Sequence, residues 1–158
     1  MRNQFGKTIV ELAEKDSKII LITGDVEHSM NEFKKMFPER FYNVGLCEQS
    51  MISMSAGLAS EGFRPIVYSI TPFLIERPFE QIKLDIDQQN LPVMLVGYSD
   101  YPTSGPTHSD LNCRTLTSLL KNTLCYFPKN SKETEEMLKD AYKYERPAFI
   151  SLKKDRTI

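Results

Sequence analysis

Several residue types and patterns are scarce in this sequence of 158 residues, and each absence excludes a class of protein. Cysteine occurs only three times, at Cys47, Cys113 and Cys125, and these positions lie far apart. An odd number of separated cysteines fits neither a disulfide framework nor a zinc site. We therefore expect free thiols at all three positions.

An excess of one charge sign is also missing. The chain has 20 Lys and Arg residues against 21 Asp and Glu residues, a net charge of -1. Nucleic-acid phosphates require a clustered surplus of basic side chains, so this balance argues against a nucleic-acid partner. No apolar run approaches the ~18 residues of a membrane helix, and the amino-terminal segment lacks the apolar stretch of a secretory signal. We expect a cytoplasmic protein with no membrane partner.

Glycine is sparse as well, and no glycine-rich phosphate-binding motif is present. What the sequence does contain is typical of a globular protein, with 41% hydrophobic and 26% charged residues. No linker, internal repeat or low-complexity tract divides it. We predict a single domain that covers residues 1–158.

Short apolar runs rich in β-branched residues alternate with segments of helical periodicity along the chain. Ile9, Leu12 and Ala13, for example, have helical spacing, and Ser131 is the predicted cap of the last helix. Such alternation is typical of an α/β fold, with a mostly parallel sheet covered by helices on both faces. We predict strands within residues 18–25, 41–45, 64–70, 91–99, 123–128 and 147–153, and helices within residues 6–18, 31–37, 48–63, 73–90, 114–120 and 131–145.

Polar residues gather after three of the predicted strands, at the ends where parallel sheets bind their ligands. These segments are residues 23–29, 43–49 and 99–110. The last of them is rich in glycine and proline and carries His108. Long loops of this kind are where binding residues concentrate, so the residues by themselves favour this loop as the site.

Glu48 and Asp25 have simple structural explanations when each is considered alone. A carboxylate in the first turn of a helix is stabilised by the helix dipole by about 0.3 to 1 kcal/mol, which is sufficient to explain Glu48. Asp25 follows a strand and fits a turn. Asp25, Glu27 and His28 lack the spacing of metal ligands, and we expect them to be surface residues.

Taken together, these segments resemble the pyrimidine-binding domain of transketolase-like thiamine diphosphate enzymes over essentially the whole chain. The resemblance rests on Pro-Glu-Arg-Phe at 38–41, Val-Gly at 44–45, Glu-Gln at 48–49, Gly-Leu-Ala at 57–59 and Gly-Pro-Thr-His at 105–108. One such pair would mean little, but the ordered set at family spacing is specific. It implies the family's α/β fold and binding of thiamine diphosphate.

The resemblance also implies a role for each matched residue. Glu48 matches the acid that shares a proton with the aminopyrimidine ring of the cofactor, and Phe73 matches an aromatic residue that packs on that ring. Ile70 stands where many relatives have another aromatic residue, and Asp25 is expected at the same cofactor site. His108 matches a histidine that hydrogen-bonds sugar hydroxyls or assists proton transfer.

The substrate side of the expected site departs from the family pattern. Arg2, Ser29 and Arg77 match or lie near positions that meet substrate phosphate or line the entrance in some relatives. Ser104 stands where relatives usually have an aspartate that binds a substrate hydroxyl, and the loop before it is short and lacks a second histidine. The identity of the sugar is therefore open, whereas the match at Glu48 is intact.

Half of the family's cofactor site is missing from this sequence. Transketolases also have a diphosphate-binding domain with a magnesium-binding Gly-Asp-Gly motif, and usually a third domain, and that motif does not occur here. The resemblance implies a separate subunit that carries the magnesium ligands, assembled with this chain as a heterotetramer, and self-association is also possible. The expected reaction is transfer of a two-carbon ketol unit between sugar phosphates or related sugars.

Three other readings of the resemblance stay open. Two are enzymatic: a subunit of a 1-deoxyxylulose-type synthase, or a subunit of a 2-oxo acid decarboxylase or dehydrogenase. The Gly-Pro-Thr-His segment favours transketolase over the beta subunits of oxo-acid dehydrogenases. The third is a non-catalytic structural or regulatory partner with a decayed site, which Ser104 and the short loop suggest and which Glu48, Phe73 and His108 argue against.

Overall fold

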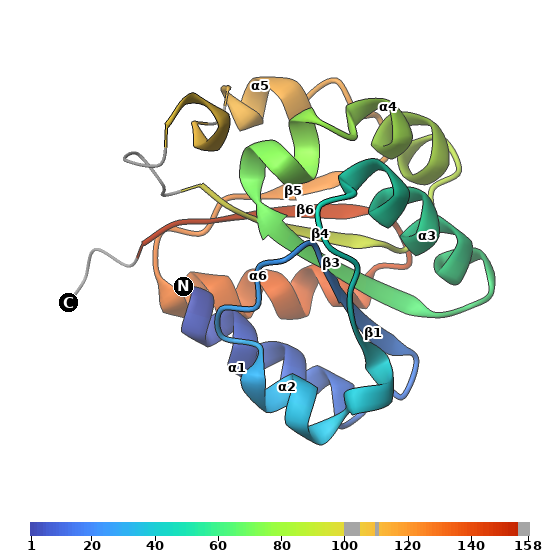
Figure 1. Cartoon of the computed structure of the whole chain (residues 1–158), viewed down its shortest axis with the longest axis vertical. Helices are drawn as coiled ribbons and strands as arrows, with labels where there is room; N and C mark the ends of the chain where they lie inside the picture. The colour runs from blue at the N-terminus through green and yellow to red at the C-terminus, as the bar shows by residue number, and fades with distance from the viewer. Residues whose placement is uncertain (100–104, 110, 155–158) are drawn as a thin grey trace.

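The structure is a computed structural model, which describes residues 1–99, 105–109 and 111–154 (Figure 1). Within these residues, six parallel strands form a sheet in the order β2-β1-β3-β4-β6-β5. The expected α/β fold with a parallel sheet is confirmed. The strands are β1 (Ile19–Thr23), β2 (Phe41–Asn43), β3 (Arg64–Ile70), β4 (Met94–Tyr98), β5 (Leu124–Tyr126) and β6 (Ala148–Leu152).

Helices cover both faces of the sheet, as Figure 1 shows. One face carries α1 (Arg2–Ala13), α2 (Asn31–Met36) and α6 (Ser131–Lys143). The other carries α3 (Glu48–Ser60), α4 (Phe79–Gln81) and α5 (Cys113–Thr117), together with the π-helical turns η2 (Pro72–Glu76) and η3 (Ile82–Asp87). Two short 3-10 turns, η1 (Pro38–Arg40) and η4 (Pro106–His108), complete the described elements.

Each face of the sheet has its own hydrophobic core, because the side chains of a strand alternate between the two faces. Tyr68 packs into the first core, where its ring stacks on Phe5 of α1 at 5.1 Å between centroids. Val67, one residue earlier on β3, belongs to the second core with Ile52 of α3. Every residue of β1, β4 and β6 is buried, which explains why these strands read as continuous apolar runs in the sequence.

The segment 73–90, predicted as one helix, is interrupted at Pro78. Proline has no backbone N–H to donate, so the regular α-helical ladder cannot run through this point. The turns on either side are wide: Arg77 N donates to Pro72 O at 3.3 Å, and Gln88 N donates to Lys83 O at 3.0 Å. These i→i+5 bonds are π-helical, a form that often marks functional sites.

Two helix boundaries also differ from the prediction. The cap of α6 is Asn130 and not Ser131, since the Asn130 side chain accepts a hydrogen bond from Glu133 N at 2.9 Å. Helix α1 begins at Arg2, four residues before the predicted start, and this extension buries Phe5 completely in the core. A burial contact therefore set this boundary, which the periodicity of residues 6–18 did not reveal.

The three cysteines form no disulfide, and Cys113 is buried whereas Cys47 and Cys125 are exposed. None of the helices in the described part of the chain combines the length and apolar character that crossing a bilayer demands. The described residues also contain no group of three His, Cys, Asp or Glu side chains placed to hold a metal ion.

Candidate functional site

The candidate site lies at the carboxyl edge of the sheet, where strand order reverses direction. From β1 the chain passes to β2 on one side and then to β3 on the other. Such switch points leave a crevice in which α/β proteins bind ligands. The loop after β2 turns at Gly45, whose φ of 73° favours glycine, and α3 then begins at Glu48. Asn43 Oδ1 ties the two neighbouring loops together by accepting hydrogen bonds from Asp25 N and Gly45 N.

Glu48 is a buried carboxylate, with 7% of its surface exposed. Its Oε1 accepts a hydrogen bond from Arg77 Nη1 at 2.6 Å, which also makes an ion pair. This charge-assisted hydrogen bond lies at the amino end of α3, where the helix dipole presents its positive end. The pair lines a hollow of about 390 Å³ with Leu46, Cys47, Gln49 and Ser50.

Phe73 and His108 extend this group of residues. The Arg77 guanidinium carbon lies 3.7 Å from the centroid of the Phe73 ring, a cation–π geometry. The His108 imidazole meets the same ring edge-on, with 4.8 Å between centroids. His108 Nδ1 is also 3.1 Å from the Thr107 hydroxyl. The structure thus joins Glu48, Arg77, Phe73 and His108 in one chain of contacts, which come from three separate segments.

The remaining expected cofactor residues lie nearby without joining that chain of contacts. Ile70 is the last residue of β3 and is buried with 6% exposure. Asp25 follows β1, is exposed, and has a φ of 63°, which agrees with the turn role that its position suggested. His28 is also exposed overall. Its pKa is lowered, mainly because part of the ring is removed from water and secondly because the positive charge of Arg2 lies nearby.

Arg2, one of the expected substrate residues, lines a different hollow from that of Glu48. Arg2 lies over the Tyr98 ring at 4.0 Å and lines a hollow of about 280 Å³ with His28 and Lys153. Ser29 donates a hydrogen bond to Asn3 Oδ1 at 2.8 Å. Ser104 lies outside the described residues. Of the three expected substrate residues that the structure describes, Arg77 is the one in contact with Glu48.

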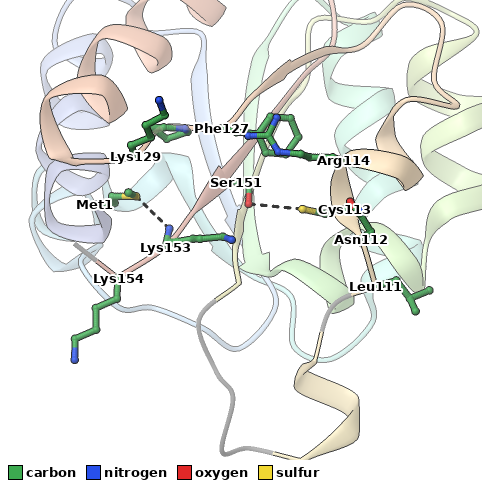
Figure 2. Close-up of a pocket in the computed structure, with 11 residues that line it drawn as sticks. Met1, Leu111, Asn112, Cys113, Arg114, Phe127, Lys129, Ser151, Lys153 and Lys154 are labelled. Atoms are coloured by element: carbon green, nitrogen blue, oxygen red, sulfur yellow. Dashed lines mark hydrogen bonds between the residues drawn. The ribbon is translucent and has the colours of Figure 1, made fainter. Parts of the chain in front are cut away.

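A larger hollow, of about 540 Å³, was not foreseen from the sequence and lies beside the ends of β5 and β6 (Figure 2). Within the described part of the chain, its lining includes four cationic side chains and no carboxylate; the cations are Arg114, Lys129, Lys153 and Lys154. Arg114 lies over the Phe127 ring at 3.8 Å, and at the back of the hollow Cys113 Sγ and Ser151 Oγ are 3.9 Å apart. The cations come from three separate stretches of sequence; Lys153 and Lys154 belong to a short basic segment, but nothing in the sequence connects them with Arg114 and Lys129.

The contact of Arg77 with both Glu48 and Phe73 was also missed. The sequence spacing indicated only the contact with Phe73, because residues four apart in a helical turn lie on the same side. The family model described as "Transketolase, pyrimidine binding domain" matches residues 1–157. The chain belongs to this family.

Relatives of this pyrimidine-binding domain fall into two groups. A 1-deoxy-D-xylulose-5-phosphate synthase of Oleidesulfovibrio alaskensis is 37% identical over 155 residues, which cover 92% of this chain and 23% of the relative. This chain therefore spans about a quarter of the length of the curated relatives that it matches. The curated relatives are synthases of this kind, whereas the solved structures described next are titled as transketolases.

The second group consists of solved structures. A structure titled "Split gene transketolase, inactive beta4 tetramer" has a TM-score of 0.88 and 29% identity, and the match covers 98% of this chain and 51% of that one. The transketolase of Campylobacter jejuni has the same fold, with a TM-score of 0.86 at 19% identity over 96% of this chain and 25% of that one.

Proposed function

We propose that this chain is the pyrimidine-binding subunit of a split, thiamine diphosphate-dependent transketolase. With a separate diphosphate-binding subunit, it transfers a two-carbon ketol unit between sugar phosphates or related sugars. The observation that carries the proposal is Glu48, a buried carboxylate at a switch-point hollow, which Arg77 links to the Phe73 ring and, through that ring, to the His108 imidazole. Likeness to a split-gene transketolase chain supports the divided arrangement.

The residues around Glu48 suit the pyrimidine half of the cofactor. A planar cation already stacks on Phe73 and donates a hydrogen bond to Glu48, so the pocket accepts a flat group with a polar edge. The hollow of about 390 Å³ leaves room beside these side chains. Offset stacking on Phe73 contributes about 0.5 to 1.5 kcal/mol beyond the burial of area.

With the pyrimidine bound, Glu48 shares one proton between a carboxylate oxygen and the pyrimidine ring nitrogen. Thiamine diphosphate, when bound, supplies a thiazolium carbon that adds to a ketose carbonyl. Burial at 7% exposure keeps water from competing for the Glu48 proton. Phe73 orients the ring, and Ile70 and Asp25 line the strand ends beside it. In this arrangement Glu48 acts on the cofactor and not on the sugar.

His108 serves the sugar. Its contact with Phe73 holds the imidazole beside the ring on which the cofactor stacks. An imidazole at this place can exchange hydrogen bonds with a sugar hydroxyl and pass a proton to or from it. Arg2, Ser29 and Ser104 contribute to sugar or phosphate binding, and Arg2 does so from its own hollow. Magnesium and diphosphate are held by the partner subunit, in a heterotetramer.

A second candidate function is favoured by the sequence relatives. The 37% identity to a 1-deoxy-D-xylulose-5-phosphate synthase supports a domain of an enzyme of that type. Such an enzyme would use the same Glu48 and Phe73 but a different donor. The choice between the two depends on the substrate loop, which includes Ser104.

A donor comparison separates the two candidates. The chain is mixed with its candidate partner subunit, thiamine diphosphate and Mg²⁺, and product formation is followed with a ketose phosphate or with pyruvate as donor. We expect turnover with the ketose phosphate and an aldose phosphate acceptor. Turnover with pyruvate and the aldose phosphate acceptor, but not with the ketose phosphate, would instead support the synthase reading. If calorimetry detects no cofactor binding to the assembled complex, the chain is a non-catalytic partner.

A further inference from the structure

One guanidinium makes both of the contacts that the proposed function assigns to the cofactor's pyrimidine. Arg77 donates to Glu48 Oε1 at 2.6 Å and lies 3.7 Å above the Phe73 ring centroid. A guanidinium is flat, delocalised and edged with N–H donors. These are also the properties of a protonated aminopyrimidine edge. Arg77 therefore imitates the group that this site is proposed to bind.

The backbone holds Arg77 at this position without tying down its side chain. Arg77 closes the wide turn η2 through its N–H, which donates to Pro72 O, and Pro78 follows directly. Phe73 and Arg77 thus lie on the same side of one turn. The Arg77 side chain itself is 42% exposed, whereas that of Glu48 is 8% exposed. The long arginine arm reaches from solvent to a buried carboxylate.

We propose that Arg77 is a placeholder for the aminopyrimidine in the unloaded chain. It occupies the face of Phe73 and the carboxylate of Glu48, and it turns outward when the pyrimidine binds. This inference rests on the proposed function, because the pyrimidine is the group that displaces it. It assigns to Arg77 a role other than contact with substrate phosphate.

The placeholder solves a problem of burial. An ionised carboxylate removed from water without a partner is unfavourable, and Arg77 supplies that partner while the site is unloaded. When the pyrimidine arrives, one proton is taken up from water and shared between its ring nitrogen and Glu48, so this N–H replaces that of the guanidinium at Glu48, and the ring replaces the guanidinium on Phe73. The Arg77 side chain is already partly exposed, so its guanidinium can rotate into water without the chain having to unfold around it.

Arg114 provides a matched control elsewhere in the same chain. Its guanidinium stacks on Phe127 at 3.8 Å, nearly the same distance as Arg77 from Phe73. Among the described residues, however, no carboxylate pairs with Arg114. Replacing either arginine by glutamine removes a charge and a cation–π contact, but only Arg77→Gln removes a competitor from the Glu48 site.

The test measures binding of 4-amino-5-hydroxymethyl-2-methylpyrimidine, the pyrimidine half of the cofactor, to the full chain by ligand-observed NMR. We expect Arg77→Gln to bind this probe roughly tenfold more tightly than the wild type, because apparent affinity scales with the fraction of molecules whose site is open. Arg114→Gln should bind like the wild type. Equal or weaker binding by Arg77→Gln would overturn the proposal.

A second measurement connects the effect to Glu48. On a Glu48→Gln background the carboxylate no longer retains Arg77, so adding Arg77→Gln should change probe affinity by less than about twofold. In wild-type chain labelled with ¹⁵N, the Arg77 Nε–H signal should shift when the probe is added. Probe binding with an unmoved Arg77 signal would also overturn the placeholder.

Failure of this inference is distinguishable from failure of the proposed function. If the assembled enzyme transfers ketol units and Arg77→Gln binds the probe no more tightly, only the placeholder role is wrong. A different result would reject both proposals: neither the wild type nor Arg77→Gln binds the probe at millimolar concentration, and the assembled complex binds no thiamine diphosphate. The proposed function is then wrong, and so is the placeholder role that rests on it.

Discussion

Two buried carboxylates stand at opposite edges of the sheet, and their surroundings differ. Asp87, 3% exposed, ends η3 near the amino end of β5. Its carboxylate accepts hydrogen bonds from the backbone N–H groups of Lys121, Asn122 and Thr123 and from the Thr123 hydroxyl, at 2.7–3.0 Å. Glu48, 7% exposed at the carboxyl edge, accepts its hydrogen bond from the end of a long side chain, Arg77.

The difference separates a structural carboxylate from one suited to chemistry. Backbone N–H groups around Asp87 cannot leave without unfolding the loop at 121–123, so this carboxylate holds the loop in place. A guanidinium on a flexible, partly exposed arm can leave Glu48 by rotation about side-chain bonds. Burial alone does not distinguish a catalytic carboxylate from a structural one. At Glu48 we expect the distinguishing feature to be a hydrogen-bond donor that can move away. Four predictions examine this contrast.

The largest expected effect is on catalysis. Glu48→Gln keeps the shape of the side chain and removes the acid, so the assembled enzyme should lose about 10²- to 10⁴-fold in kcat. Ketol transfer under saturating cofactor measures this loss, and circular dichroism verifies the fold. Glu80→Gln, an exposed change in the nearby helix α4, is the control and should retain full activity. Full activity of Glu48→Gln would contradict the assigned role.

The second effect is on stability and concerns Asp87. Asp87→Ala leaves the N–H groups of Lys121, Asn122 and Thr123 without their acceptor, and we expect a loss of roughly 3 kcal/mol in the free energy of unfolding. Urea unfolding measures the loss. If the change is below about 1 kcal/mol, Asp87 does not hold the loop, and the contrast with Glu48 disappears.

The third effect is the pH dependence of stability. Burial raises the pKa of Asp87, but hydrogen bonds from Thr123, Lys121 and Asn122 outweigh it and hold the pKa below the usual value of 3.8. A carboxyl with a lowered pKa stabilises the fold above its unfolded pKa, and the contribution is lost as pH falls through the folded pKa. The stability gap between wild type and Asp87→Asn should therefore shrink below about pH 4. Urea unfolding at several pH values measures the gap, and a gap that stays constant down to about pH 2 would refute this.

The smallest effect compares the two stacked arginines. Arg114→Gln loses one cation–π contact with Phe127, and we expect a loss of about 0.5 to 1 kcal/mol in unfolding free energy. Arg77→Gln also leaves Glu48 without its cation, but exposure of the arm limits the loss to roughly 1 to 2 kcal/mol. Thermal unfolding compares them. A smaller loss for Arg77→Gln than for Arg114→Gln would mean that the ion pair contributes nothing to stability.

Much of the fold was predictable from the sequence because its signals are local. The apolar run around Ile19–Thr23 and the segment Arg64–Ile70 are strands where periodicity and β-branched residues indicated them. The break at Pro78 and the cap at Asn130 were missed, although both are also local. The family match supports the expected cofactor class, whereas the roles of Glu48, Phe73 and His108 stay predictions.

Contacts between distant segments were not predictable. Nothing near Asp87 in the sequence points to the loop at 121–123, and nothing near Glu48 points to Arg77. The cations of the larger hollow, Arg114 among them, likewise come together only in the folded chain.

The sequence by itself determined the alternation of strands and helices and the burial of the central strands, because these follow from short-range patterns of apolar and polar residues. It also indicated the family, through the resemblance of an ordered set of motifs along the whole chain. Only the tertiary structure decided which donor each buried carboxylate received. A side chain's partner depends on where the sheet order brings segments far apart in sequence, and hydrogen bonds form only over about 3 Å. Asp87 and Glu48 therefore differ in their donors: backbone N–H groups hold Asp87, whereas the Arg77 side chain reaches Glu48.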